Sequence, residues 1–474
     1  MADAELVVIG AGPGGYAAAF LAADLGMDVT LVDPNPNPGG VCLYRGCIPS
    51  KALLHVAKVI HESGQAPNWG VTFSKPTFDL DTMRAWKNSV VEKLTGGTGE
   101  MGKRRKVKYR QGKAHLTGPT DLYITAADGS TETISFGKAI IATGSYPAGL
   151  PGFPKSPRIW DSTRALDLPE VPQRLLVVGG GYIGLELGTV YAALGSKVTV
   201  VEVLDSLLPG VDPDLVRPLA RRLQKEFEAI QLGTRVTEVR EEKDAIRVTL
   251  ETEGKKPAEA AFDAVLVSVG RRPMTKGLGL QHTKVQVDGH GFIHVDAQRR
   301  TAEPTLYAIG DVAGEPMLAH KATHEGRTAV EAIHGDAVAF EPAAIPAVIF
   351  TDPEIAWAGL TEAAAKERGR PVRVAKFPWA ASGRAITLGR TDGVTKLVVD
   401  PETERILGMG VCGPGAGELI AEGVLAIEMA ARVKDVELSI HPHPTLTESV
   451  MEAASVFFGT SPHYYAPKRK GKQG

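Results

Sequence analysis

The feature that most constrains this chain is a glycine-rich turn between a short apolar stretch and an alanine-rich stretch. Residues 6–9 predict a strand, residues 16–26 predict a helix, and a second strand over 29–32 ends at Asp33. The turn between strand and helix carries four glycines: Gly10, Gly12, Gly14 and Gly15. A G-x-G-x-x-G turn in this setting predicts a βαβ unit that binds a dinucleotide.

The glycines of this turn have distinct expected roles. Gly10 allows the tight turn, Gly12 lets a pyrophosphate approach the backbone, and Gly15 lets the helix pack closely on the strand. The start of the helix offers N–H donors to the phosphates, and Asp33 is placed to accept a hydrogen bond from a ribose hydroxyl. A glycine-rich turn without a ligand is the alternative, and the strand, helix and acid together argue against it.

The same pattern occurs a second time. A strand over 175–178 leads through glycines into a helix that extends to about residue 194, and the next strand, 197–201, ends at Glu202. The spacing from Gly10 to Asp33 equals that from Gly179 to Glu202, 23 positions in each case. The chain is therefore predicted to contain two dinucleotide folds. The candidate ligand-binding residues of the second turn are Gly179, Gly181, Tyr182, Ile183 and Gly184.

Glu202 favours one nucleotide over another. Its carboxylate would bind the free 2′-hydroxyl of NAD and repel the 2′-phosphate of NADP. Residues 203–205 contain no arginine to receive that phosphate. The second fold is therefore predicted to bind NAD.

Cysteine is rare, and two of the three cysteines lie close together. Cys42 and Cys47 flank Gly46, while Cys412 is far away in the chain. An i, i+5 pair can reach disulfide distance in a distorted helical turn, and glycine lets the backbone distort. On the pair alone, a redox disulfide and two reduced, buried thiols are equally supported.

Composition limits the remaining choices. The 474 residues predict two to four domains, and 53 basic against 55 acidic residues do not favour nucleic acid or an anionic membrane as partner. No signal peptide and no membrane helix is expected. The chain therefore reads as cytoplasmic, where a disulfide is expected to be catalytic rather than structural.

The order of these motifs resembles the flavin-disulfide reductase family over nearly the whole chain, and within it the branch that oxidises dihydrolipoamide. The resemblance implies an α/β fold with two Rossmann-like domains, for FAD and NAD, and a C-terminal α+β interface domain. The expected boundaries are 1–147 for the first part of the FAD domain, 148–275 for the NAD domain, 276–344 for a segment completing the FAD site, and 345–474 for the interface domain.

The resemblance also assigns roles to single residues. Segments 113–115 and 305–311 resemble family motifs that contact FAD, 142–144 resembles the crossover from the FAD domain into the NAD domain, and 268–273 resembles the crossing back. They add Ala114, Thr143, Gly144, Gly310 and Asp311 to the FAD site and Gly270 to the NAD site. Lys51 and Glu186 resemble the family's ion pair beside the flavin N5, and Tyr182 would cover the nicotinamide pocket.

The resemblance supplies the catalytic residues as well. Cys42 and Cys47 correspond to the family's redox disulfide, and His443 and Glu448 to its acid–base pair, which reaches the disulfide of the other subunit of a homodimer. Without the family, a His-x-His pattern is more often packing or a chance metal pair. The implied reaction oxidises protein-bound dihydrolipoamide and passes hydride to NAD. The implied partners are lipoyl domains of an acyltransferase or the glycine cleavage carrier protein.

Other functions remain as alternatives. Glutathione reductase and mercuric reductase belong to the same family. Glu202 argues against an enzyme that uses NADPH, and the absence of a C-terminal cysteine pair argues against mercuric reductase. A soluble transhydrogenase would lack Cys42 and Cys47. A structural subunit of a multienzyme assembly with an idle redox site is the alternative from a different class.

The chain departs from the family at Tyr44-Arg45, where Asn-Val is usual, and Asp33 replaces the commoner Glu. Arg45 puts a cation two residues from Cys47, and a nearby cation lowers the pKa of a thiol. The Arg45 side chain is equally free to point into solvent.

Four further features have plain interpretations. The basic run over 103–110 is expected to be a solvated helix end rather than an RNA site. His320 and His324 have i, i+4 spacing but no third ligand, so no metal is expected. Cys412 is expected to be a buried small side chain, and the basic tail over 468–472 to be disordered.

Overall fold

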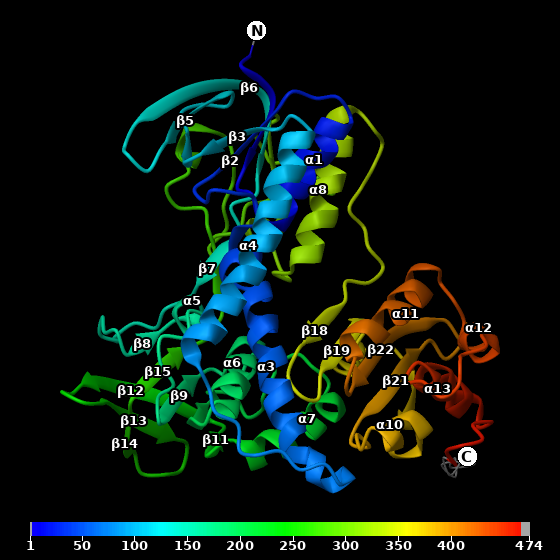
Figure 1. Ribbon diagram of the computed structural model, residues 1–474. Helices are drawn as coiled ribbons and strands as arrows, with labels where there is room; N and C mark the ends of the chain where they lie inside the picture. The colour runs from blue at the N-terminus through cyan, green and yellow to red at the C-terminus, as the bar shows by residue number, and fades with distance from the viewer. Residues whose placement is uncertain (1, 466–474) are drawn as a thin grey trace. The chain divides into compact units, whose positions relative to one another are not determined.

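The computed structural model describes residues 2–465 (Figure 1), so the basic tail at 468–472 lies outside the described residues. Two compact units are present. The first joins the residues up to 171 with residues 266–341, and the second joins 172–265 with the residues from 342 onward. Within the described part of the chain, no helix is both long enough and apolar enough to cross a membrane.

The first unit is built on a parallel sheet in the order β3-β2-β1-β6, with β17 on the other side of β6 at its C-terminal end. The strands are β1 (Ala4–Ile9), β2 (Val29–Asp33), β3 (Lys108–Gln111), β6 (Thr131–Ile141) and β17 (Leu306–Ala308). Their apolar side chains are buried on both faces of the sheet, as a parallel sheet covered by helices requires.

An antiparallel extension continues from the first half of β6 through β5 (Asp121–Thr125) to β4 (Lys113–Leu116). A separate two-stranded sheet joins β7 (Ser145–Pro147) to β16 (Arg271–Pro273). It pairs two segments that the sequence places at opposite ends of the expected NAD domain.

Helices α1 and α8 pack side by side against the parallel sheet (Figure 1). The helices of this unit are α1 (Pro13–Asp24), α2 (Gly40–Arg45), α3 (Cys47–Gln65), α4 (Leu80–Arg104), α5 (Ser162–Leu166) and α8 (Ala319–His334). The helix expected from residue 16 begins at Pro13, because proline is already shaped for a first helical turn. The basic run begins at the C-terminal end of α4, where cations suit the helix dipole, but it continues into β3, which contains Lys108 and Arg110.

The second unit repeats the nucleotide-fold pattern in its 172–265 segment. Its sheet has the order β11-β10-β9-β15, and β10 pairs in parallel with both β9 and β11. An antiparallel meander, β12-β13-β14, follows β11. The elements are β9 (Arg174–Val178), α6 (Tyr182–Ala193), β10 (Lys197–Val201), α7 (Pro213–Glu226), β11 (Ala229–Gln231), β12 (Thr234–Glu241), β13 (Ile246–Thr252), β14 (Ala258–Phe262) and β15 (Ala264–Val267).

The rest of the second unit is an antiparallel sheet in the order β18-β19-β22-β21-β20, against which α11 and α13 pack. Cys412, at the end of β22, is fully buried as predicted, and burial raises the pKa of its thiol. The elements are β18 (Ala347–Ile349), β19 (Ile355–Gly359), α9 (Glu362–Glu367), β20 (Arg373–Pro378), α10 (Gly383–Thr387), β21 (Val394–Val399), β22 (Ile406–Cys412), α11 (Ala416–Glu428), α12 (Val433–Leu438) and α13 (Glu448–Phe458).

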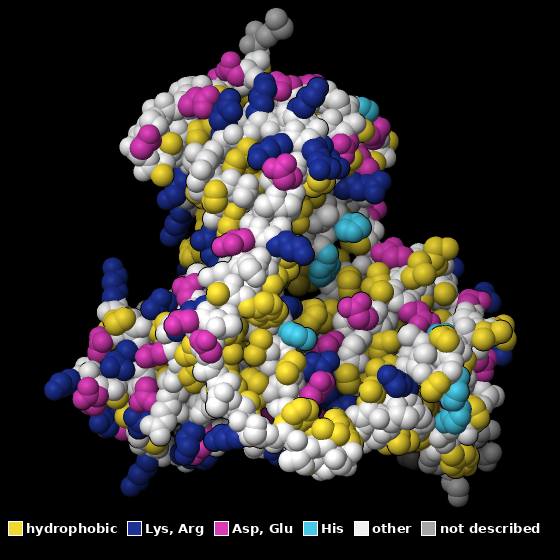
Figure 2. Space-filling view, viewed as in Figure 1, with side chains coloured by type: hydrophobic (Ala, Val, Ile, Leu, Met, Phe, Trp, Pro, Cys, Tyr) yellow, Lys and Arg dark blue, Asp and Glu magenta, His cyan; other side chains and the backbone are white. Residues whose placement is uncertain are grey.

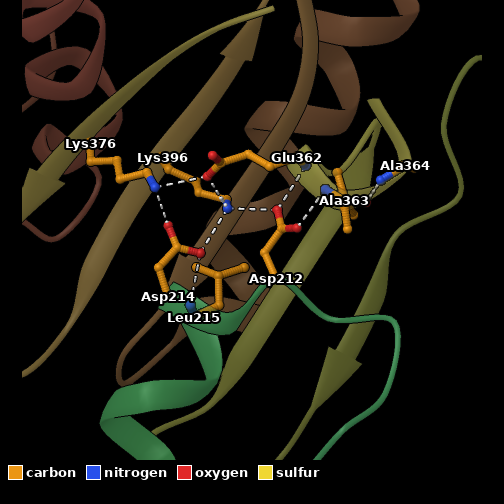
Figure 3. Close-up of polar contacts among 9 residues, drawn as sticks. Asp212, Asp214, Leu215, Glu362, Ala363, Ala364, Lys376 and Lys396 are labelled. Atoms are coloured by element: carbon orange, nitrogen blue, oxygen red, sulfur yellow. Dashed lines mark hydrogen bonds and ion pairs between the residues drawn. The ribbon is translucent and has the colours of Figure 1, made fainter. Parts of the chain in front are cut away.

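A buried ion cluster ties these two parts of the second unit together (Figure 3). Lys396 Nζ, on β21, lies 2.6 Å from Asp212, 2.8 Å from Asp214 and 2.8 Å from Glu362. Lys376 Nζ, on β20, contacts Asp214 and Glu362 from the other side, at 2.6 and 2.8 Å. Among the described residues the three carboxylates are the only acid or histidine group spaced to hold a metal ion, and Lys396 already supplies a cation to them.

Apolar side chains are exposed on the C-terminal part of the second unit, which begins at residue 342. Figure 2 shows yellow side chains gathered over α11 and α12. Leu425 and Leu438, on these helices, and Met429 and Ile440, just beyond their C-terminal ends, are between 63% and 97% exposed. Monomeric proteins rarely leave several large apolar side chains this open in one region, so this surface is a candidate for contact with another protein.

Candidate active site

The two cysteines lie on either side of a break between two helices. Cys42 belongs to α2 and is half-buried, while Cys47 is exposed and is the first residue of α3. The break is at Gly46, where a Cβ atom would meet the carbonyl oxygen of Val41 at 2.9 Å. A helix N-terminus favours a negative charge, so the position of Cys47 suits a thiolate.

The two thiols are close enough to hydrogen bond. The Cys42 thiol donates to Cys47 Sγ, and this hydrogen bond, together with burial, raises the pKa of Cys42 far above its usual value, while the charge of Lys51 opposes the shift. Lys51 lies one helical turn after Cys47 on α3. In the dithiol form, Cys42 therefore keeps its proton.

The first glycine turn touches the helix that carries Cys42. Gly39 N donates to Ala11 O at 2.7 Å, and a Cβ atom on Gly40 would lie 2.4 Å from the Cα atom of Gly12. Only glycine allows backbones to approach this closely. The cysteine pair and the first glycine turn are thus parts of one site.

The geometry of the first turn agrees with the roles expected from the sequence. Gly10 has a φ of +101°, and a Cβ atom on Gly15 would lie 1.8 Å from the carbonyl oxygen of Gly10. Gly14 differs, because it faces α8: a Cβ atom there would meet Ala322 O at 2.8 Å. Its missing side chain serves the packing of α1 against α8.

The residues of this turn fit a bound dinucleotide. Gly12 is the N-cap of α1 and provides no side-chain cap, so the first N–H groups of the helix are available to an anion. A Cβ atom at Gly12 would have nothing closer than 4.0 Å, so the space above the turn is open. A pyrophosphate such as that of FAD matches these donors.

Asp33 is more engaged than the sequence predicted. Its Oδ2 atom accepts from Ala11 N at 2.8 Å, and its Oδ1 atom accepts from the backbone and side-chain nitrogens of Asn35 at 2.9 and 2.7 Å. Asp33 therefore holds the glycine turn in shape. A carboxylate has about four acceptor sites, so a site remains for a ribose hydroxyl.

The second glycine turn has the same construction. Gly180 N donates to Glu202 Oε2 at 2.6 Å, as Ala11 N donates to Asp33, and Leu204 N donates to Oε1 at 2.9 Å. Helix α6 also starts without a side-chain cap, at Gly181. Tyr182 is partly exposed at the first position of α6, and Ile183 and Gly184 follow it. These donors fit the pyrophosphate of a second dinucleotide.

Glu186 lies one turn further along α6. It is buried and accepts a hydrogen bond from Phe350 N at 2.9 Å. Lys51 belongs to the first unit and Glu186 to the second. Their ion pair stays a prediction.

The crossing segments meet in the small sheet of β7 and β16. Thr143 Oγ1 donates to Met274 O at 2.7 Å, and Met274 N donates to Gly144 O at 2.8 Å. Gly270, with a φ of +112°, accepts from Ala148 N at 2.9 Å. Two motifs far apart in the sequence are therefore held together.

Asp311 is positioned by residues that the sequence did not single out. Its Oδ2 atom accepts from Ser145 Oγ, which in turn accepts from Arg271 Nε at 2.8 Å. Arg271 also donates to Ser145 O at 2.7 Å. The crossing motif contained Arg271, but nothing in the sequence linked it to Ser145.

A buried glutamate fixes the turn before Asp311. Glu325 Oε2 accepts from Gly310 N at 2.6 Å, and its Oε1 atom contacts Arg299 at 2.9 Å and Lys321 at 3.1 Å. Glu325 is fully buried. The i, i+4 pair of Lys321 and Glu325 was the only sign of this network in the sequence. Ala114, the remaining FAD candidate, lies in β4 opposite Ile124.

His443 and Glu448 form a pair at the start of α13. His443 Nδ1 is 2.8 Å from Glu448 Oε1, and Glu448 Oε2 accepts from Thr445 N at 2.8 Å. Burial acts to raise the pKa of Glu448, but the hydrogen bonds from Thr445 and His443 outweigh it and hold the pKa below its usual value. With Nδ1 engaged, Nε2 of the exposed imidazole is left for a reacting proton.

His441 is a poorer candidate for acid–base work. Its Nδ1 atom contacts Ser439 O and its Nε2 atom contacts Glu422 Oε1, both at 2.8 Å, and its side chain is only 8% exposed. Both ring nitrogens are therefore engaged. Geometry favours His443 over His441 without reference to any family.

Residues 4–326 match the family described as pyridine nucleotide-disulphide oxidoreductase, and residues 345–454 match that family's dimerisation domain. The chain belongs to the pyridine nucleotide-disulphide oxidoreductase family. Its mixed α/β fold is the one predicted from the sequence.

Two relatives match nearly the whole chain. A dihydrolipoyl dehydrogenase of Vibrio cholerae is 48% identical over 98% of this chain and 99% of its own length. One from Haemophilus influenzae is 50% identical over 96% of this chain and 95% of its own length.

Solved structures of flavoprotein disulfide reductases and related proteins have a similar fold. LpdA from Mycobacterium tuberculosis superposes with a TM-score of 0.88 at 27% identity, covering 95% of this chain and 99% of that one. The flavoprotein disulfide reductase RclA from Escherichia coli gives 0.84 at 28% identity, with coverage of 95% and 99%.

Proposed function

We propose that this protein is an NAD-dependent dehydrogenase that oxidises dihydrolipoyl groups to lipoyl disulfides through a Cys42–Cys47 redox disulfide and bound FAD. The observation that carries the proposal is the hydrogen-bonded cysteine pair: Cys47 begins a helix, and Cys42 belongs to the helix whose first residue packs on the first glycine turn. Relatives of 48–50% identity that are named dihydrolipoyl dehydrogenase supply the substrate. The proposed location is the cytoplasm, where a disulfide is expected to be reduced and reoxidised during catalysis rather than to stabilise the fold.

Two sets of residues would hold the cofactors. The support for two nucleotide sites is that α1 and α6 both begin without a side-chain cap. Those assigned to FAD are Gly10, Gly12, Gly14, Gly15, Asp33, Lys51, Ala114, Thr143, Gly144, Gly310 and Asp311. Those assigned to NAD are Gly179, Gly181, Tyr182, Ile183, Gly184, Glu186, Glu202 and Gly270. A flavin held at the first site supplies a two-electron acceptor between the enzyme dithiol and NAD.

The sulfur chemistry proceeds by exchange. His443 removes a proton from one substrate thiol, because the thiolate is the nucleophile. This thiolate attacks Cys42 Sγ, a substrate–Cys42 disulfide forms, and the bond to Cys47 breaks and leaves Cys47 as a thiolate. The second substrate thiol displaces Cys42 and closes the lipoyl disulfide. The electron pair now resides in the two enzyme thiols.

The protein groups around the sulfurs match these roles. The raised pKa of Cys42 means that this sulfur takes up a proton when it is displaced. Glu448 is ionised at neutral pH, so it orients His443 by accepting from Nδ1.

We also propose a homodimer in which His443 of the partner subunit serves the cysteines of this one. The dimerisation-domain match over residues 345–454 and the exposed apolar side chains of α11 and α12 support it. The proposed domain limits are 1–147, 148–275, 276–344 and 345–474. Lipoyl domains of an acyltransferase or of the glycine cleavage carrier are the proposed partners.

A turnover assay tests the proposal. Purified protein should be yellow and reduce NAD with dihydrolipoamide, and it should not reduce glutathione disulfide with NADPH. Cys47→Ser should abolish dihydrolipoamide turnover while FAD stays bound, whereas Cys412→Ala, at a buried thiol outside the site, should retain it. Wild-type turnover in Cys47→Ser would refute the redox disulfide. Activity with NADPH and glutathione disulfide, and none with dihydrolipoamide and NAD, would show that the proposed substrate is wrong.

A further inference from the structure

Arg45, the last residue of α2, reaches the loop that follows β2. Its Nη2 atom donates to Asn35 Oδ1 at 2.9 Å. The sequence left two fates open for this cation: a partner for the neighbouring thiol or an exposed side chain. In the structure the guanidinium instead hydrogen bonds to Asn35, in the loop that follows β2.

Asn35 connects Arg45 to the acid of the first glycine turn. The Asn35 side-chain nitrogen donates to Asp33 Oδ1 at 2.7 Å, and Asp33 Oδ2 accepts from Ala11 N at 2.8 Å. The loop is held from its other side as well, because Tyr109 Oη donates to Asn35 O at 2.7 Å. A continuous series of hydrogen bonds therefore runs from Arg45 through Asn35 and Asp33 to the turn expected to hold FAD.

The series is incomplete at Arg45. Its Nε atom is buried and has no hydrogen-bond partner among the described residues. Leaving a buried donor unsatisfied costs about 1–3 kcal/mol, so such a group calls for an acceptor that the protein itself does not provide. A guanidinium prefers an oxygen acceptor, above all an anionic one.

We propose that Arg45 is a cofactor-binding residue whose Nε–H donates to an oxygen on the ribose side of the FAD bound at the first glycine turn. This inference rests on the proposed function, because it takes FAD as the ligand of that turn. Asp33 and Arg45 then contact the same part of the cofactor, one accepting and one donating. Arg45 acts on FAD affinity, and the cysteine pair keeps its reactivity without it.

The test compares FAD affinity in three variants. FAD is removed from the purified protein, and binding is followed by flavin fluorescence as FAD is added back. Arg45→Met, which removes the guanidinium, should raise the Kd for FAD about 10- to 100-fold. Arg45→Lys keeps the charge but lacks the Nε–H group and should fall between Arg45→Met and wild type. Arg104→Met, at the exposed last residue of α4, should bind FAD as wild type does.

A second measurement separates the two possible roles of the cation. Alkylation of Cys47 in the FAD-free dithiol protein, followed against pH, should give the same profile in wild type and Arg45→Met. Thermal unfolding of the FAD-free proteins shows whether each variant is folded, and Arg45→Lys carries the test if Arg45→Met is not.

Two results would overturn the inference in distinguishable ways. Equal FAD affinity in wild type, Arg45→Met and Arg45→Lys refutes the role of Arg45 alone, and a shifted alkylation profile would then assign the cation to the thiol. A wild-type protein that binds no FAD refutes the proposed function, and this inference with it.

Discussion

Replacing Lys396 by Met tests how much the buried ion cluster contributes to stability. Lys396 is 2% exposed, and among the residues that the structure describes its ammonium is the only cation in contact with Asp212, which is itself 2% exposed. Methionine fills a similar volume without the charge. Asp214 and Glu362 keep Lys376 as a counter-ion.

The magnitude follows from what Asp212 retains. After the change, two backbone donors from the described part of the chain remain on its carboxylate, Glu362 N at 3.0 Å and Ala363 N at 3.1 Å. Removing one partner of a buried ion pair typically costs about 3–5 kcal/mol, because the other charge is left uncompensated. For a unit of this size, such a loss lowers the unfolding midpoint by roughly 6–20 °C.

The deficit should depend on pH in a stated direction. Lys396 is one of the two lysines whose hydrogen bonds lower the pKa of Asp214, so its removal takes away part of a stabilisation that is lost in acid. The difference between variant and wild type should therefore be smaller in acid than at neutral pH. In the wild type, burial acts to raise the pKa of Asp214, but its bonds to Lys376 and Lys396 prevail and lower it. That contribution to stability is present above the unfolded pKa of Asp214 and is lost only in acid.

Thermal unfolding at one fixed protein concentration is the assay, because a dimer makes the midpoint depend on concentration. Lys366→Met, at an exposed lysine of α9, is the matched control and should change the free energy of unfolding by less than about 0.5 kcal/mol. A Lys396→Met midpoint within 2 °C of the control at pH 8 would show that Asp212 is adequately solvated, and the reasoning would fail.

Two further changes probe the site. Glu448→Gln should slow turnover about 10²- to 10⁴-fold with FAD content unchanged, because His443 loses the carboxylate that orients it; steady-state kinetics check this. Gly15→Ala should give protein that retains little FAD, since the added Cβ would lie 1.8 Å from a backbone oxygen; the ratio of flavin to protein absorbance checks it.

Each of these changes has a matched control. Glu422→Gln removes the carboxylate on His441 and should slow turnover far less than the change at Glu448. Gly97→Ala, on α4 with nothing within 4 Å, should leave FAD content unchanged. Equal losses in the two glutamine variants would contradict the assignment of His443, and full FAD content in Gly15→Ala would contradict the close packing of the first turn.

Much of the candidate site could be predicted from the sequence because its motifs are formed by residues close together in the chain. The two glycine turns follow from strand, glycines, helix and acid within a short span, and the structure gives Gly10 and Gly15 the geometry expected of them. The cysteine pair and the His443–Glu448 pair are likewise short-range patterns. Their assignment as catalytic residues remains part of the proposed function.

The sequence by itself determined the α/β class, the two nucleotide folds and the short motifs, because backbone conformation and helix starts depend on neighbouring residues. Only the tertiary structure decided which distant residues support those motifs. Ser145 with Asp311, Gly310 with Glu325, and Lys396 with Asp212 are pairs of this kind. Such pairs form where the packing of separate elements buries polar groups that must find partners, and a sequence without its fold does not show where that burial occurs.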